Sequence, residues 1–264
     1  MNFETLKNFL DENYERYNQK KFIENDPICI PHLFEKKQDI EVMGFLAATL
    51  AWGQRKTIIN KCMQLIHIFE HAPHDFILHH TERDLRKIPD FKHRTFNQTD
   101  LLYFIKALKF LYKKYDSLEL VFSDAVHEHD KNIGNGLISF HQAFFSLPNH
   151  PQRTIKHIPT PARNSACKRL NMYLRWMVRK DDKGVDFGIW NNIKTSQLVC
   201  PCDLHVSRIA RKLQLITRKQ NDWKTAEELT ENLKKFDPND PVKYDFALFG
   251  VGIHEEKFFK YSKI

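Results

Sequence analysis

The chain has 264 residues, 42% of them hydrophobic and 12% aromatic, which is enough to build the core of one large domain or two small ones. Lysine and arginine, 41 in all, outnumber the 33 acidic residues, so the net charge is +8 and the pI is near 9.1. This balance favours a nucleic acid or another anionic surface as partner, or an otherwise ordinary basic enzyme. No apolar run reaches the length of about 18 residues that a membrane helix needs, so we expect no membrane partner.

The five cysteines are odd in number and show no spacing typical of a disulfide framework. The segment from Met1 to Leu6 carries an early acid and lacks the apolar run of a signal peptide. We therefore expect a cytoplasmic protein. Cys200, Cys202 and His205 resemble half of a metal site, and residues 127–130 also have metal-ligand spacing, but neither has a matching second half, so we expect no metal.

Hydrophobic periodicity predicts an all-α chain in which alternating strand patterns are scarce. The predicted helices, in chain order, are 3–18, 39–52, 56–71, 100–114, 118–127, 135–146, 164–179, 203–213, 224–236 and 241–249. Residues 71–89 and 148–161 are predicted to be loops, because prolines interrupt both segments. The helix over 39–52 is apolar on all sides, which indicates burial at the centre of the domain.

The first segment with functional character is the turn that follows this buried helix. The helix ends near Trp52 and Gly53, and the polar residues Gln54, Arg55 and Lys56 then lead into the next helix. A polar tip of this kind can reach into a nucleic-acid groove. The alternative is an ordinary turn between two helices.

The second segment is the predicted helix over 164–179. At about 100° per residue, Lys168, Met172, Arg175 and Arg179 fall on one face, opposite an apolar stripe, so we expect a cationic face directed to solvent. This face would present a lysine to a phosphate-rich ligand, with the two arginines binding its backbone. The alternative is a solvated face without a ligand.

The third segment begins at Pro201 and Asp203. The aspartate stands where a helix N-cap belongs, and the helix that follows carries Arg208, Arg211 and Lys212. A carboxylate at a helix start beside cations can be a catalytic base. The alternative is a plain N-cap, since aspartate is one of the favoured capping residues.

Together these segments resemble the helix-hairpin-helix DNA glycosylase superfamily. Residues 45–54 look like its early apolar helix with the glutamine that fills the gap left by a flipped base. Residues 201–208 resemble its Pro-x-Asp-x-His motif, and Lys168 stands where members with lyase activity place their nucleophile. The chain is most similar to a bacterial family within this superfamily through segments 171–179, 186–190 and 240–250, with the archaeal 8-oxoguanine glycosylases as the nearest characterised relatives.

The resemblance implies an all-α, helix-hairpin-helix DNA glycosylase-like fold, with one unit over 1–264 and two helical lobes around a cleft. The lobes are expected at 35–150 and at 1–34 plus 151–264. The implied activity is removal of an oxidised purine, 8-oxoguanine first, from double-stranded DNA through a lysine Schiff base, by a monomer without a cofactor. The alternatives are a member that binds damaged DNA without cutting it, and an RNA-binding or structural helical protein.

The implied site residues divide by role. Lys168 and Asp203 are the catalytic candidates, and Trp52 and Trp190 are candidates for the base pocket. The candidates for DNA contact are Gln54, Arg55, Lys56, Arg163, Arg169, Arg175, Arg179, His205 and Arg208.

The sequence also departs from the superfamily. The expected hairpin, residues 158–165, has none of the glycines whose backbone normally approaches a DNA phosphate, although Asn164 can adopt a left-handed conformation. Lys168 and Asp203 are 35 positions apart, further than in most members. Lys183, in the inserted loop, therefore competes with Lys168 as the nucleophile.

Overall fold

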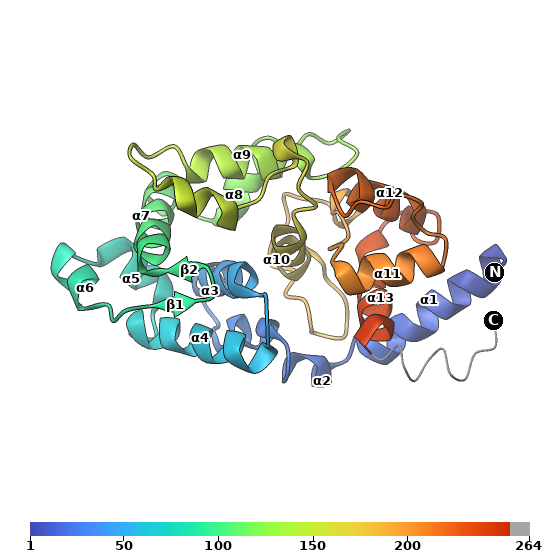
Figure 1. Cartoon of the computed structure of the whole chain (residues 1–264), viewed down its shortest axis with the longest axis horizontal. Coiled ribbons are helices and arrows are strands. Elements are labelled where there is room, and N and C mark those ends of the chain that lie inside the picture. The colour runs from blue at the N-terminus through green and yellow to red at the C-terminus, as the bar shows by residue number, and fades with distance from the viewer. Residues whose placement is uncertain (254–264) are drawn as a thin grey trace.

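The computed structural model describes residues 1–253, and this part of the chain is nearly all helix (Figure 1). The predicted all-α class is therefore confirmed. The single sheet in residues 1–253 is a short hairpin in which β1 (Lys92–His93) pairs antiparallel with β2 (Phe96–Asn97).

All ten predicted helices are present, with ends that differ from the predicted ends by up to four residues. They are α1 (Phe3–Tyr17), α3 (Lys37–Leu50), α4 (Arg55–Ile68), α7 (Gln98–Lys114), α8 (Leu118–Ser123), α9 (Gly134–Phe144), α10 (Lys168–Val178), α11 (Leu204–Lys212), α12 (Trp223–Lys234) and α13 (Tyr244–Ile253). A further short helix, α2, covers Lys20–Ile23.

The loop predicted over residues 71–89 is wrong, because this segment contains α5 (Pro73–His79) and α6 (Glu82–Lys87). Pro73 occupies the first turn of α5, where a helix has no partner for the missing N–H. Thr81 and Asp84 form a reciprocal capping box that starts α6. The 3₁₀ turns are η1 (Pro27–Cys29), η2 (Pro31–Leu33), η3 (Gln152–His157), η4 (Pro161–Arg163), η5 (Thr195–Gln197) and η6 (Pro241–Lys243). Prolines begin η1, η2, η4 and η6.

Helix α10 lies between two groups of helices (Figure 1). The group formed by α3 to α9 lies on one side, and α1, α11, α12 and α13 lie on the other. Helix α10 packs on α3, while both α1 and α11 pack on α13. The turns η1 and η2 lie against α3, so residues 27–33 join the first group rather than the second.

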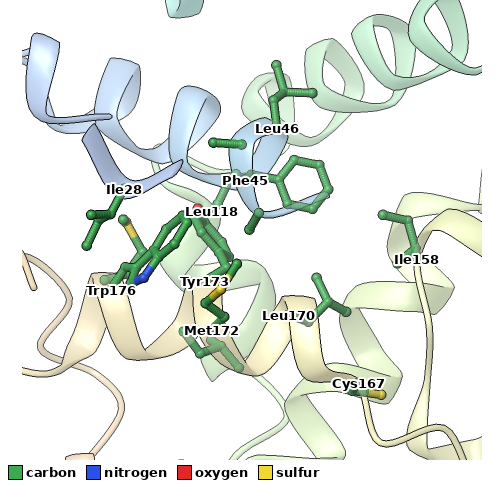
Figure 2. Close-up of a cluster of buried hydrophobic side chains, with 14 of the residues drawn as sticks. Ile28, Phe45, Leu46, Leu118, Ile158, Cys167, Leu170, Met172, Tyr173 and Trp176 are labelled. Atoms are coloured by element: carbon green, nitrogen blue, oxygen red, sulfur yellow. The ribbon is translucent and has the colours of Figure 1, made fainter. Parts of the chain in front are cut away.

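The contact between α3 and α10 forms the centre of the core (Figure 2). Phe45 from α3 meets Tyr173 of α10 with ring centroids 5.8 Å apart, and both rings are fully buried. Gly44 allows this approach, since a Cβ atom there would lie 3.1 Å from the Met177 Cε atom and 3.3 Å from the Tyr173 ring. Each buried aromatic or large aliphatic side chain stabilises the fold by about 1.5–3 kcal/mol.

A buried carboxylate ties α3 to four other groups. Glu41 has no exposed surface, and it accepts hydrogen bonds from the Tyr112 hydroxyl at 2.9 Å, from the Leu118 N–H at 3.1 Å, from the Ser117 hydroxyl, and from the Trp190 indole N–H at 2.8 Å. Burial raises the pKa of Glu41 above its usual range.

Trp190 is therefore a core residue, and its prediction as part of a base pocket is wrong. The side chain is only 2% exposed and packs beside Tyr173 and Phe122. The indole N–H needs a buried acceptor and finds it 149 positions earlier, in Glu41.

We predict that Glu41→Ala lowers the free energy of unfolding by about 3 kcal/mol or more, because it leaves several buried donors without an acceptor. Glu41→Gln keeps one acceptor oxygen and should cost clearly less. Urea denaturation of both variants checks this expectation. Equal stability of the alanine variant and the wild type would show that these hydrogen bonds contribute nothing to the fold.

Candidate functional site

A cavity of about 620 Å³ lies where α10 meets the start of α4, the start of α11 and one side of α13. Its apolar lining includes Phe22, Ile58, Met172, Trp176 and Phe249. Its ionisable lining consists of Asp26, Arg55, Lys168, Arg169, Arg175, Asp203, His205 and Asp245. A pocket of this size with an apolar wall and a few converging polar groups is typical of a small-molecule or cofactor site.

Lys168 and Asp203 face each other in this cavity. The Lys168 Nζ atom lies 3.9 Å from the Asp203 Oδ2 atom, and the two side chains are 26% and 21% exposed. Lys168 is the first residue of α10, and its amine also lies 3.6 Å from the Met172 sulfur. Asp203 is the N-cap of α11 and accepts the Val206 N–H at 2.9 Å. The fold thus brings together the two residues predicted to be catalytic, with both side chains still open to a ligand.

The turn before Lys168 sets where α10 begins. Asn164 adopts the left-handed conformation, with φ of 55°, that the sequence analysis had named as open to it. Cys167 is also left-handed, with φ of 49°, and this residue separates the turn from the helix. The helix therefore starts at Lys168 instead of Asn164, which places the lysine on the first turn and at the cavity.

The hairpin expected to bind a phosphate uses its backbone donors internally. The N–H groups of Ala162, Arg163, Asn164 and Ser165 all bond to oxygens of Thr160 or Pro161. The Cys167 N–H bonds to the Ser165 hydroxyl at 3.3 Å.

The same turn is tied to α12. The Asn164 side chain donates to Asp222 at 3.1 Å, and Asp222 is the N-cap of α12 and also pairs with Arg218 at 2.7 Å.

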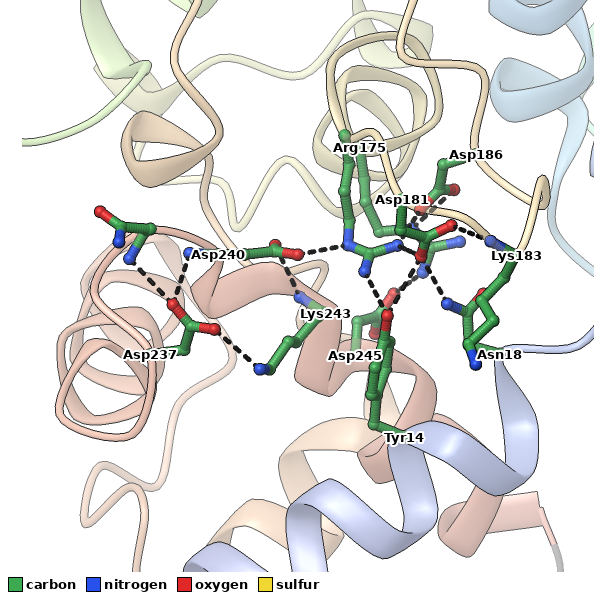
Figure 3. Close-up of polar contacts among 12 residues, drawn as sticks. Tyr14, Asn18, Arg175, Asp181, Lys183, Asp186, Asp237, Asp240, Lys243 and Asp245 are labelled. Carbon is green, nitrogen blue, oxygen red and sulfur yellow. Dashed lines mark hydrogen bonds and ion pairs between the residues drawn. The ribbon is translucent and has the colours of Figure 1, made fainter.

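The cationic solvent-side face predicted for α10 is wrong. Arg179 is 1% exposed and pairs with Asp181 at 2.6 Å, Asp186 at 3.2 Å and Asp240 at 2.8 Å, while its second nitrogen donates to the Tyr14 hydroxyl at 2.9 Å (Figure 3). These partners come from α1, from the loop after α10 and from the start of η6. Periodicity along α10 carried no sign of them, because they lie in other segments.

Arg175 is likewise buried, at 4% exposed, and it pairs with Asp186 at 3.3 Å and with Asp245 of α13. It borders the cavity, but its charge is already matched by two carboxylates. Arg175 and Arg179 therefore fasten α10 to its neighbours and are not available to DNA phosphates in this structure.

Two buried carboxyl groups of the cavity were missed by the sequence analysis. Asp245 is 5% exposed, and burial raises its pKa to about 6 against the opposing effect of Arg175. Asp26 is 6% exposed, and burial raises its pKa as well. The sequence did offer one sign of Asp245, since it is an acid within the otherwise apolar residues 244–251. Asp26, which precedes Pro27 and caps η1, looked like an ordinary turn residue.

Trp52 lines the cavity as predicted for a base-pocket candidate, and Arg169 holds it there. The Arg169 guanidinium lies 4.6 Å from the centre of the Trp52 ring and donates to the carbonyls of Thr49 and His157. Arg169 thus belongs to the cavity wall, and burial lowers its pKa to about 10.

The polar tip after α3 forms the rim of the cavity. Gln54 is exposed at the N-cap position of α4 and makes no capping hydrogen bond with its side chain. Arg55 lies over the Phe249 ring at 5.4 Å and borders the cavity, and Lys56 is exposed beside it.

The remaining predicted contacts are spread over three places. His205 is exposed at the cavity near Asp203. Arg208 donates to the Gly252 carbonyl at 3.1 Å, and Arg163 is exposed on the turn before α10.

Lys183, the competing nucleophile, does not line the cavity. Its amine pairs with Glu15 at 2.8 Å, and its backbone N–H bonds to Asp181. Within residues 1–253, no group of three or more histidine, cysteine, aspartate or glutamate side chains is arranged to hold a metal ion. In the same residues, no helix combines the length and the apolar character needed to cross a membrane.

We predict that Arg175→Met lowers the free energy of unfolding by about 3–5 kcal/mol, because it leaves buried carboxylates without their partner. The exposed residue Arg163 provides a control, since Arg163→Met should change stability by less than about 0.5 kcal/mol. Urea denaturation at pH 7 measures both. If the two variants are equally stable, the network does not hold α10 in place.

Comparison with known proteins gives one match. A family model with the description "Protein of unknown function (DUF2400)" matches residues 26–254, a range that includes both Lys168 and Asp203. No curated protein and no solved structure matches the chain. Because the family model covers most of the chain, this protein belongs to the DUF2400 family.

Proposed function

We propose that this protein is a DNA glycosylase with β-lyase activity that removes an oxidised purine, 8-oxoguanine first, through a Schiff base on Lys168. The observation that carries the proposal is the 3.9 Å approach of the Lys168 amine to the Asp203 carboxylate inside a 620 Å³ cavity. The net charge of +8 supports a polyanionic substrate.

The chemistry follows from the two side chains. The neutral Lys168 amine attacks C1′ of the sugar, the bond from C1′ to the base breaks, and the base leaves with the bonding electrons. The resulting amine adduct loses a proton and rearranges to a Schiff base as the sugar ring opens. Asp203, at the start of α11, accepts a proton from the amine or stabilises positive charge on the sugar.

The cavity suits a base that has left the duplex. A base inside the helix cannot be reached, so the nucleotide must rotate outward and its place must be filled. Trp52, Phe22 and Phe249 supply apolar surface at the cavity wall for the flipped base. Gln54, exposed on the rim, has the length and polarity to fill the vacated space.

The arrangement also supports the likeness to helix-hairpin-helix glycosylases. A buried helix leads to the turn with Gln54, a second turn leads to Lys168 at the first residue of α10, and Asp203 then caps α11. These are the positions that the family motifs assign to the glutamine that fills the gap, to the lysine nucleophile and to the catalytic aspartate.

A second candidate function is binding of damaged DNA without cleavage. The internal hydrogen bonds of residues 162–165 favour it, because this turn lacks the free backbone donors with which a glycine-rich hairpin contacts a phosphate. Covalent trapping distinguishes the two functions, because only the enzyme forms a reducible adduct.

We predict that the wild-type protein is trapped by borohydride on a duplex containing 8-oxoguanine and that Lys168→Gln abolishes both trapping and strand cleavage. Lesion binding should remain largely intact, since glutamine keeps the length and helix propensity of the side chain. Lys183→Gln is the matched control, because Lys183 pairs with Glu15 and does not line the cavity.

Mass spectrometry of the trapped peptide identifies the adduct. An adduct on Lys183 would contradict the assignment of Lys168. Base release without any adduct would mean that water is the nucleophile, and no release from any lesion would favour the DNA-binding function.

We predict that Asp203→Asn keeps the fold, because asparagine is also a good N-cap, and lowers the rate of base excision by about two to four powers of ten. Single-turnover excision at saturating enzyme measures the rate, and the melting temperature reports the fold. A folded variant that excises bases at the wild-type rate would show that Asp203 is only a cap.

A further inference from the structure

The turn that precedes Lys168 is poorly suited to hold a DNA strand. The backbone N–H groups of residues 162–165 and of Cys167 already have acceptors within the turn. The Asn164 side chain also donates to the Asp222 carboxylate, so this amide is already bonded within the protein. If DNA enters the cavity, its backbone needs cationic contacts elsewhere on the rim.

The β1–β2 hairpin supplies cations at that rim. The His93 Nε2 atom lies 3.2 Å from the Trp52 carbonyl oxygen, and the centroids of the His93 and Trp52 rings are 5.4 Å apart. Arg94 covers Gly53, since a Cβ atom on that glycine would lie 3.1 Å from the Arg94 Nη1 atom. In Figure 1 the hairpin lies beside α3 and α4, whose connecting turn contains Gly53. The tip of the hairpin is therefore next to Gln54.

The tip is hydrogen-bonded to η3 through Arg153. Arg153 donates to the Thr95 carbonyl at 3.0 Å and to the Asn97 side chain, and it pairs with Asp100 at 3.0 Å. Arg94 has a φ of 54°, which is uncommon for a residue other than glycine and is imposed by the two-residue turn. A fixed tip presents its charged groups with little loss of conformational entropy on binding.

The hairpin and the neighbouring start of α4 also carry exposed cations. Lys92 and Arg94 are both exposed, and Lys56 is exposed at the start of α4. Asp90 is the exposed acid nearest to them along the hairpin. A guanidinium can bond a phosphate through two parallel N–H groups, and an ammonium binds it as a point charge.

We propose that two exposed cations of the β1–β2 hairpin, Arg94 at its tip and Lys92 at the start of β1, bind backbone phosphates of the DNA next to the nucleotide in the cavity. The proposal rests on the proposed function, because it assigns a partner surface to the same site. It places the contact with the strand at the β1–β2 hairpin beside Gln54, instead of at the turn before α10.

The test measures the salt dependence of duplex binding. Lys92→Gln combined with Arg94→Asn removes two charges, and asparagine tolerates the left-handed conformation at the tip. Arg83→Gln combined with Arg86→Gln is the matched control, since it removes two charges from the exposed side of α6. Fluorescence anisotropy follows binding of an 8-oxoguanine duplex and an undamaged duplex between 50 and 200 mM salt, and melting temperatures confirm the fold.

The slope of log affinity against log salt should shrink by about two units in the hairpin variant, equally for both duplexes, because about one counterion is released for each phosphate contact. The control variant should keep the wild-type slope. A hairpin variant with the wild-type slope, or one that loses no more than the α6 control, would overturn the proposal.

Borohydride trapping by the wild-type protein separates this proposal from the proposed function. Normal trapping together with an unchanged slope in the hairpin variant would overturn the hairpin contact alone. A wild-type protein that neither binds duplex DNA nor is trapped on it would overturn both. Tighter binding to an RNA duplex of the same sequence than to DNA would also contradict the assignment.

Discussion

The position of α10 is the constraint on which the rest of the structure depends. On one side, Tyr173 packs into the space that Gly44 leaves on α3. On the other side, Arg175 and Arg179 pair with carboxylates from α13, from η6 and from the loop after α10 (Figure 3). Apolar packing and a buried ionic network thus hold one helix between the two groups of helices, and neither arginine can lose its partners cheaply.

Because α10 is fixed, its first residue is fixed relative to the start of α11. Lys168 lies on the first turn of α10 and Asp203 at the N-cap of α11, so the 3.9 Å contact depends on how two helix ends meet. Arg175 links this contact to α13, where its partner Asp245 also borders the cavity. The same side chains that stabilise the core therefore shape the wall of the site.

The cavity contains charges of both signs in a partly apolar environment. The carboxyl groups of Asp26 and Asp245 are buried, and their raised pKa values reflect the cost of ionising them there. Exposed cations lie outside the cavity, at Lys56 on the rim and at Lys92 and Arg94 on the β1–β2 hairpin. Under the proposed function, this separation leaves the DNA backbone at the surface while the flipped base enters the cavity.

The sequence by itself determined the all-α class, the ten main helices, and the local roles of Asp203 as an N-cap and Asn164 as a left-handed residue, because periodicity and capping act within a few positions along the chain. Tertiary structure decided the rest. It turned the predicted cationic face of α10 into a buried network, placed Trp190 against Glu41, and brought Asp26 and Asp245 to the cavity beside Lys168. The physical reason is that burial and ion pairing depend on partners as far as 149 positions away, as for Trp190 and Glu41, and a helical pattern shows which residues share a face but not what covers it.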